Sequence, residues 1–592
     1  MRTRLFFALL ICVLWLVDCA KQPEEPLEIF ADPGGMVVQK ATQASLAEEL
    51  SARKANGAKV QKHFVAGEDH LREGQYAAAA ERYRLSVSDL PTLSAQLNCG
   101  LAFLLASEYS RAKISLQAGL RQSTAHGDFA AAFCAGLGQL YQREGKLDSA
   151  AAYLHQSLSA SARSSRSSHA AGQALVTGNL GATSFMRGEM DSALVYLQRA
   201  SKLHRQAGDG RGLARDADRM ATVLLIQGEV DSAFSAYRDA ERLYRQVADR
   251  SGLARTLGNL GNAYFDQDQL DRALDAYEES LALHRQGSDE ATQAALLERI
   301  GRIHWRKGRL QQAGDKYRLV EQIHRRQDDS RRRASAVEAL GHIHQQQARF
   351  DSALTAFQVA LSLYQQHPSH PAEIAAQFDN IGNVHLYRGQ LDSALVAYQQ
   401  ALAIYIRHNH PRGRAVQASK MGQVLSKLGR FDEALQAHRD ALELYREFDL
   451  YMEGGAELDF IGRVYVAQDS LHKALAVFQD ALHVFTQAGS RQGEAAQLDN
   501  IGNTYFERGE FDKALKAFGD ALHVFRLLEH RRGEAQSLGN IGLLHRRRGE
   551  DAVALKYLEQ ARTAYLGIGL RGAGVRVVER AIAEISAGKG IR

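Results

Sequence analysis

The sequence predicts an all-α solenoid of about thirteen helix-turn-helix repeats that ends in a capping helix. Three observations lead to this prediction. A phrase such as Leu260-Gly261-Asn262 recurs in thirteen segments, and nine of the twelve steps between them are 40 or 41 residues. Apolar residues within each segment follow helical spacing. The chain also holds 50 glycines but only 7 prolines, which is typical of many helices that end in glycine turns.

The N-terminal segment resembles a targeting sequence. Arg2 and Arg4 precede thirteen apolar residues, 5–17, which is too short a run to cross a bilayer and is typical of a signal peptide. Cys19 follows Leu-Val-Asp in a pattern that resembles the lipidation site of bacterial lipoproteins, although Asp18 departs from it. Ordinary cleavage nearby and an uncleaved anchor remain as alternatives.

These features predict the organisation of the whole chain. We expect a lipoprotein-type signal peptide at 1–18, a tether at 19–36 and an N-terminal helix at 37–59. The repeat array is expected at 60–570, and a capping helix with a short tail at 571–592. The predicted location is the bacterial cell envelope, with the protein anchored to the membrane through lipidated Cys19.

A glycine marks the first helix of almost every repeat. Twelve residues later stands an alanine in all thirteen repeats, from Ala79 to Ala554, and we expect two helices to cross closely there. Seven residues after the marker stands Gly in nine repeats, where we expect a turn of positive φ. In eight repeats an aspartate such as Asp148 follows, which we expect to cap the second helix and to interact with its dipole. The marker positions are Gly67, Gly100, Gly138, Gly181, Ala221, Gly261, Gly301, Gly341, Gly382, Gly422, Gly462, Gly502 and Gly542.

An aromatic residue or histidine also recurs near the end of the second helix in ten repeats. Because all ten fall at one register, we expect them to form one packed seam. They are His204, Tyr244, His284, His324, Tyr364, Tyr405, Tyr445, Phe485, Phe525 and Tyr565.

This pattern resembles the tetratricopeptide repeat, whose glycine, aromatic and alanine positions correspond to Gly261, Tyr264 and Ala273. The usual period of that family is about 34 residues, so the longer period here predicts longer helices. Such repeats resemble those of the Leu-Gly-Asn adaptor family. The resemblance implies a right-handed superhelix whose first helices line a concave surface that binds a protein or an extended peptide.

No catalytic motif is present in the sequence. A P-loop, a nucleophile elbow, H-E-x-x-H and C-x-x-C are all missing, so we predict a non-enzymatic protein without catalytic residues, metal, cofactor or small-molecule substrate. The repeats and the cap leave no room for a separate catalytic domain. Basic runs such as Arg331–Arg333 have no interleaved aromatic residues, so nucleic acid is not an expected partner.

Candidate binding residues are polar or aromatic side chains on the predicted first helices, near the marker glycines. Asparagine amides can both donate to and accept from a peptide backbone, although some of them can instead hold the neighbouring repeat. Asp379 and Asp499 stand where the peptide-clamping members of the family that bind chaperone tails have lysine, so such tails are not expected ligands. Membrane contact is expected only through the N-terminal lipid or signal segment. The candidates are Asn259, Asn262, Arg302, Trp305, Asp379, Asn380, Asn383, Arg463, Asp499, Asn500 and Asn503.

The main alternative function is that of an intracellular or membrane-anchored regulatory scaffold. In that case residues 5–17 would be an uncleaved anchor.

Overall fold

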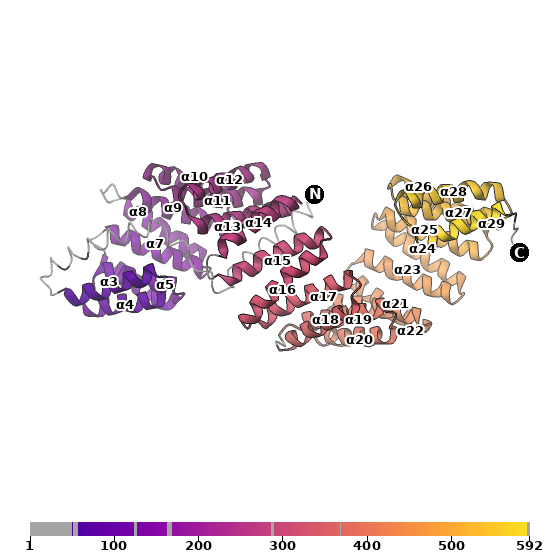
Figure 1. Cartoon of the computed structure of the whole chain (residues 1–592), viewed down its shortest axis with the longest axis horizontal. Helices are drawn as coiled ribbons and strands as arrows, with labels where there is room; N and C mark the ends of the chain where they lie inside the picture. Colours follow the sequence, from indigo (N-terminus) through magenta and orange to yellow (C-terminus); the bar gives the residue numbers. More distant parts are fainter. Residues whose placement is uncertain are drawn as a thin grey trace. The chain divides into compact units, whose positions relative to one another are not determined.

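The computed structural model describes residues 46, 50, 57–123, 127–162, 169–285, 289–366 and 369–588. Within these residues the chain consists of helices and short turns, and no strand is present (Figure 1). The predicted all-α solenoid of helix-turn-helix repeats is therefore confirmed. The predicted signal peptide, the tether, Cys19 and most of the helix expected at 37–59 lie outside the described residues. None of the described helices is long and apolar enough to cross a lipid bilayer.

First helices, here called A helices, alternate along the chain with second helices, called B helices. The A helices are α3 (Ala58–Arg72), α5 (Leu93–Leu105), α7 (Gly127–Arg143), α9 (His169–Met186), α11 (Gly210–Gln227), α13 (Arg250–Asp266), α15 (Glu290–Arg306), α17 (Ser330–Gln346), α19 (Pro371–Tyr387), α21 (Pro411–Lys427), α23 (Tyr451–Ala467), α25 (Arg491–Glu507) and α27 (Arg531–Arg547). The B helices are α4 (Tyr76–Asp89), α6 (Tyr109–Gln122), α8 (Leu147–Ser161), α10 (Met190–Ala207), α12 (Val230–Gln246), α14 (Leu270–His284), α16 (Leu310–Arg326), α18 (Phe350–Gln365), α20 (Leu391–Arg407), α22 (Phe431–Glu447), α24 (Leu471–Gln487), α26 (Phe511–Leu527) and α28 (Asp551–Gly567).

The helices form two compact units, Met1–Lys307 and Gly308–Arg592. Within each unit every helix packs against the next one in the chain. At the end of the second unit, α29 (Ala573–Ser586) packs against α28 and α27 and buries Val575 and Val578. It thus covers the apolar face of the last pair, as expected of a cap.

The marker glycines lie where a side chain of the following B helix presses against the A helix. At eleven of them, a Cβ atom would come within 2.4–2.9 Å of the side chain sixteen residues later. At Gly261, for example, this side chain is the ring of Tyr277, and at Gly542 it is Leu558. All thirteen predicted crossing alanines, from Ala79 to Ala554, are fully buried. The expectation of a close crossing is therefore confirmed.

The turn between the A helix and the B helix has the predicted positive φ in all thirteen repeats. The nine glycines have φ of 69–84°. Four other residues, Ser107, Asp268, Ala348 and Asp469, adopt φ of 55–60° at the same position. Side chains with a Cβ are strained in this region, so these four turns are locally less favourable.

The predicted caps of the B helices are wrong in detail. Asp148 is the second residue of α8, and its N-cap, Lys146, accepts no side-chain hydrogen bond. The aspartate is still in the first turn, where its charge suits the helix dipole. Its carboxylate faces Arg187, the residue directly after α9 in the next repeat, at 3.3 Å, and Arg388, directly after α19, contacts Asp351 in the same way at 2.7 Å. This aspartate therefore joins two repeats instead of capping its own helix.

Side-chain caps lie instead at the starts of the A helices, and the sequence analysis did not predict them. Asp209, Asp249 and Asp329 accept hydrogen bonds from the backbone N–H three residues later, at 2.9–3.0 Å. His410 and His530 do the same through Nδ1, at 2.9 and 3.0 Å. Each cap satisfies one of the free N–H groups of its helix.

The expected aromatic seam is packed at the junction between repeats. Seven of its ten members, among them Tyr244 and Phe525, are buried. Tyr244 lies against Gly252 at the start of α13, where a Cβ atom would approach the ring to 2.2 Å. Glycines therefore leave space for an aromatic ring both within a repeat, as at Gly261, and between repeats, as at Gly252.

Replacing Ala348 with glycine should stabilise the protein, because glycine adopts positive φ without strain. Ala348 is exposed and has a φ of 57°, so no buried contact is lost. We expect Ala348→Gly to raise the free energy of unfolding by about 1 kcal/mol, measured by urea unfolding and circular dichroism. The reverse change, Gly429→Ala at the equivalent turn, should lower it by a similar amount. Equal midpoints for all three proteins would contradict the strain assigned to this turn.

Candidate functional site

Within each unit, the A helices form the more closely spaced side of the stack. Successive A helices contact one another, as α9 does with α11, α11 with α13, and α23 with α25. No two B helices in the described part of the chain approach as closely. Side chains on this face can therefore reach from one repeat to the next.

Five acidic residues, each three positions before the marker, contact the following A helix. We call this set the acid ladder. In each case the partner lies 41 or 42 residues further along the chain. The pairs are Asp218 with Asn259 (3.4 Å), Glu338 with Asn380 (3.3 Å), Asp379 with Lys420 (2.6 Å), Asp459 with Asn500 (2.6 Å) and Asp499 with Asn540 (3.4 Å).

The acid ladder leaves little free hydrogen-bonding capacity at its best-connected members. Lys420 donates to both carboxylate oxygens of Asp379, at 2.6 and 2.7 Å, and Gln417 donates to the same group at 2.9 Å. Asp459 accepts from Gln497 at 2.9 Å and lies 2.8 Å from the Nε atom of Arg463. Charge-assisted contacts of this kind hold successive repeats in register.

The asparagines directly after the marker glycines are also used within the chain. The side-chain oxygen of Asn262 accepts from the Tyr277 hydroxyl at 2.6 Å and from Arg299. Asn383 accepts from Tyr398 at 2.8 Å and donates to Asp379 at 3.1 Å. The amides of Asn259, Asn380 and Asn500 thus bond to an acid of the preceding repeat, and those of Asn262 and Asn383 bond to a tyrosine of their own repeat.

Asn503 differs from Asn262 and Asn383. It is partly exposed and has no hydrogen-bond partner among the described residues. The reason lies fifteen residues later, where the tyrosine of the other two repeats is replaced by Phe518, which has no hydroxyl group. The Asn503 side-chain amide is thus left without an internal partner in the described part of the chain.

Gln423 has a second side-chain amide without an internal partner among the described residues, and it was not predicted from the sequence. It occupies the same register in α21, and no side chain in the described part of the chain bonds to it. The residue fifteen positions later, His438, is buried and directs Nδ1 to Glu457 at 2.7 Å. The open amides of Asn503 and Gln423 could have been predicted from the sequence, because the residue fifteen positions later is Phe518 or His438 and not a tyrosine.

The remaining candidates occupy different environments on the A helices. Arg302 is exposed, and its guanidinium lies 5.4 Å from the centre of the Phe265 ring. Trp305 is partly buried in the same helix. Arg463 is exposed but paired with Asp459, as described above.

Asp499 is the member of the acid ladder whose titration is most affected by burial. Burial raises the pKa of its carboxyl group to about 6, against hydrogen bonds from Ser537, Gln536 and Asn540 that favour the charged form. All three of these donors are neutral. Desolvation therefore outweighs hydrogen bonding at this position.

A buried charged cluster in α11 was not predicted from the sequence. Asp216 is fully buried, and its carboxylate lies 3.7 Å from His204 of α10. Burial raises the pKa of Asp216 to about 6 and lowers that of Arg215 to about 10. The available signal was the run Arg215-Asp216-Ala217-Asp218-Arg219, whose charges cannot all lie on one exposed helix face.

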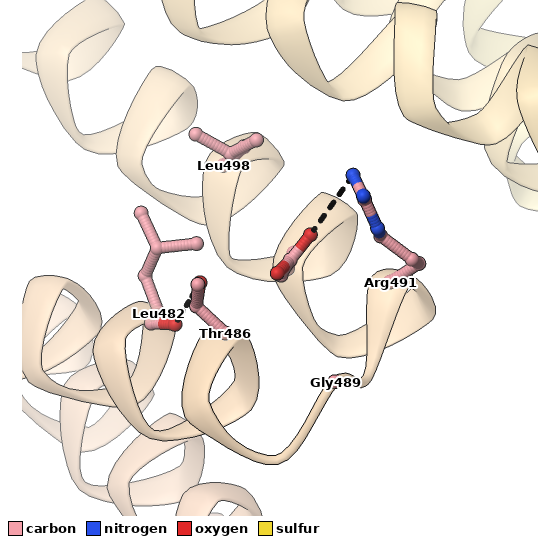
Figure 2. A pocket seen from close by; sticks show the side chains of 6 residues that line it. Leu482, Thr486, Gly489, Arg491 and Leu498 are labelled. Carbon is pink, nitrogen blue, oxygen red and sulfur yellow. Dashed lines mark hydrogen bonds and ion pairs between the residues drawn. The ribbon is translucent and has the colours of Figure 1, made fainter.

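A shallow hollow lies between α24 and α25, separate from the acid ladder (Figure 2). Leu482 and Leu498 line it on one side, and Arg491 and Glu494, 3.9 Å apart, line it on the other. In the described part of the chain, no group of three His, Cys, Asp or Glu side chains is arranged to hold a metal ion.

Comparison with known proteins agrees with this architecture. The family model described as "Tetratricopeptide repeat" matches over half of the chain, at residues 213–286, 292–366, 373–447, 413–487, 455–526 and 494–566. No curated protein sequence matches the chain.

Three solved structures illustrate the structural similarity. BtubC (BKLC) from P. vanneervenii is 20% identical, with a TM-score of 0.33, over 37% of this chain and 92% of its own. The apo form of RapI is 14% identical, with a TM-score of 0.38, over 50% of this chain and 100% of its own. The APC/C hetero-tetramer Cut9-Hcn1 is 15% identical, with a TM-score of 0.33, over 89% of this chain and 97% of the matched chain. These TM-scores are too low for any of the three structures to indicate the function of this chain.

The raised pKa of Asp499 predicts a pH-dependent stability. The folded state binds a proton at the Asp499 carboxylate more tightly than the unfolded state does. Protonation of this group therefore stabilises the fold below about pH 4, and the stabilisation is lost as pH rises through about 6. Asp499→Asn removes the titration. We expect the variant to gain stability relative to the natural chain between pH 4.5 and 7.5, by on the order of 2 kcal/mol, measured by urea unfolding at each pH. Ser537→Ala in the chain that keeps Asp499 removes a donor to the carboxylate, so it should raise the folded-state pKa further and extend the loss of stability to higher pH. A constant difference across this pH range would contradict the assignment.

Proposed function

The chain belongs to the tetratricopeptide repeat family, and we propose that it is a non-enzymatic scaffold that binds a protein or an extended peptide along its A helices. The observation that carries this proposal is the open amide of Asn503. It lies in a row of equivalent positions whose other asparagines are occupied by the chain itself.

The acid ladder supports this role because it fixes the spacing of the A helices before a ligand arrives. A preorganised surface loses less conformational freedom on binding. Several weak contacts at successive repeats can then add up to a useful affinity, since each later contact forms at a high effective concentration. Asn503 and Gln423, on α25 and α21, provide two such contacts in the second unit.

Removing the open amide should weaken partner binding without destabilising the fold. We expect Asn503→Ala to reduce the amount of captured partner by about five- to tenfold, which corresponds to one net hydrogen bond. The measurement is a quantitative pull-down from an extract of the producing cells, with the full-length chain as bait.

Asn383→Ala is the matched control at the same register. It removes the acceptor of Tyr398 and a donor to Asp379, so we expect a lower unfolding midpoint. Equal partner recovery with Asn503→Ala and with the natural chain would exclude ligand contact at Asn503.

We also propose that the protein is exported and anchored to a bacterial membrane through Cys19. This proposal rests on the apolar segment 5–17 and the lipidation-like site that follows it. In a bacterial host, Cys19→Ala should move the protein from the membrane fraction to the soluble fraction, detected by immunoblotting. If the variant stays in the membrane and retains Met1, residues 5–17 are an uncleaved anchor.

A further inference from the structure

The hollow between α24 and α25 contains a carboxylate with unused hydrogen-bonding capacity. The side chain of Glu494, on α25, is 13% exposed and forms an ion pair with Arg491 at 3.9 Å. This distance is too long for a hydrogen bond, and no other side chain in the described part of the chain donates to the carboxylate. Thr486 of α24 is nearby, but its hydroxyl donates to the Leu482 carbonyl of its own helix at 2.9 Å (Figure 2). Acceptor sites on the Glu494 carboxylate therefore remain open.

The next junction along the chain, between α26 and α27, has the same carboxylate with its acceptor sites occupied. Glu534 stands forty residues after Glu494, and its side chain is also 13% exposed. Arg526 of α26 donates to one of its carboxylate oxygens at 3.0 Å, and Arg531 donates to the other at 3.0 Å. Although burial acts to raise the pKa of Glu534, the hydrogen bonds from the two arginines lower it. Two guanidinium groups therefore satisfy a carboxylate in this environment.

The residue at position 486 accounts for the difference between the two junctions. Arg491 and Arg531 correspond to each other, and both side chains are 67% exposed. Thr486, however, stands where the next junction has Arg526. Arginine is the most frequent residue at this register, so Thr486 departs from the pattern of the array. The other arginines at this register are Arg205, Arg245, Arg285, Arg325 and Arg446.

The apolar residues of the hollow also lack the cover that their equivalents have. Leu482 and Leu498 are partly exposed, whereas Leu522 and Leu538 at the next junction are 7% and 2% exposed. The aliphatic part of an arginine can cover apolar surface of this kind while its guanidinium reaches a carboxylate. Gly489 adds no side chain to the rim of the hollow. Space, apolar surface and an acceptor are thus present where an arginine would use them.

We propose that this hollow binds an arginine side chain of a partner protein, in the place that Arg526 takes at the next junction. The guanidinium of the bound side chain donates to the Glu494 carboxylate, and its methylene groups lie on Leu482 and Leu498. Lysine fits less well because its ammonium cannot donate two parallel hydrogen bonds to one carboxylate. The proposal rests on the scaffold function above and adds a side chain that the partner must carry.

The binding test uses the full-length chain in detergent and the peptide acetyl-Gly-Arg-Gly-amide, with saturation-transfer NMR as the measurement. The same peptide with citrulline, which keeps the shape of arginine but has no charge, should bind about tenfold more weakly. Glu494→Gln should weaken binding of the arginine peptide about tenfold. Glu534→Gln is the matched control. It removes a carboxylate that the chain itself already occupies, so it should leave binding unchanged.

Substitutions of Thr486 separate an open hollow from a filled one. Thr486→Arg places a guanidinium of the chain itself in the hollow. We expect about tenfold weaker binding of the arginine peptide, a similar loss of partner in the pull-down, and a higher unfolding midpoint. The higher midpoint excludes unfolding as the cause of the loss. Thr486→Ala keeps the hollow open and should leave both kinds of binding unchanged.

Three results would overturn the proposal. The first is equal binding of the arginine and citrulline peptides, and the second is equal loss in Glu494→Gln and Glu534→Gln. The third is tighter binding of spermidine than of the arginine peptide, which would assign the hollow to a free amine. If the pull-down depends on Asn503 but not on Thr486→Arg, only the arginine assignment falls and the scaffold function stands.

Discussion

The repeats depend on a close contact between a glycine and a bulky side chain. In eleven of the thirteen pairs, a side chain from the B helix occupies the space where the Cβ atom of the A-helix glycine would be, as Tyr398 does at Gly382. The buried alanine of the same pair lets the two backbones approach. A methyl group added at the glycine would force the ring out of place, at a cost of about 1–3 kcal/mol. Since the same contact recurs along the array, the register of every other side chain follows from it.

That register gives the polar side chains of the A helices two competing uses. A carboxylate or an amide on this face can bind a ligand, or it can bind the next repeat about 41 residues away. Asp379 and Asp459 are used by the chain itself, and their hydrogen bonds with Lys420, Gln497 and Asn500 of the next A helices hold the repeats together. Only positions whose internal partner is missing remain available to a partner protein.

The fold was predictable because its signals are local and repeated. Gly429 in the turn and Ala434 at the crossing follow from spacing within a single repeat. The roles of the polar residues were harder to predict, because each depends on a residue in another helix. Asp148 was expected as a cap, yet its carboxylate faces Arg187, directly after α9 in the next repeat. Asn383 was a candidate for ligand contact with an internal role as the alternative, and its amide bonds to Tyr398 and Asp379. The buried charges around Asp216 depend likewise on His204 in the preceding helix.

Once the register is known, however, the open positions can be found from the sequence. The amide after a marker glycine is occupied where a tyrosine stands fifteen residues later, as at Asn262 and Asn383. It is open where that residue is Phe518 or His438. In the proposed scaffold, binding specificity would therefore be set by the positions whose internal partners are absent.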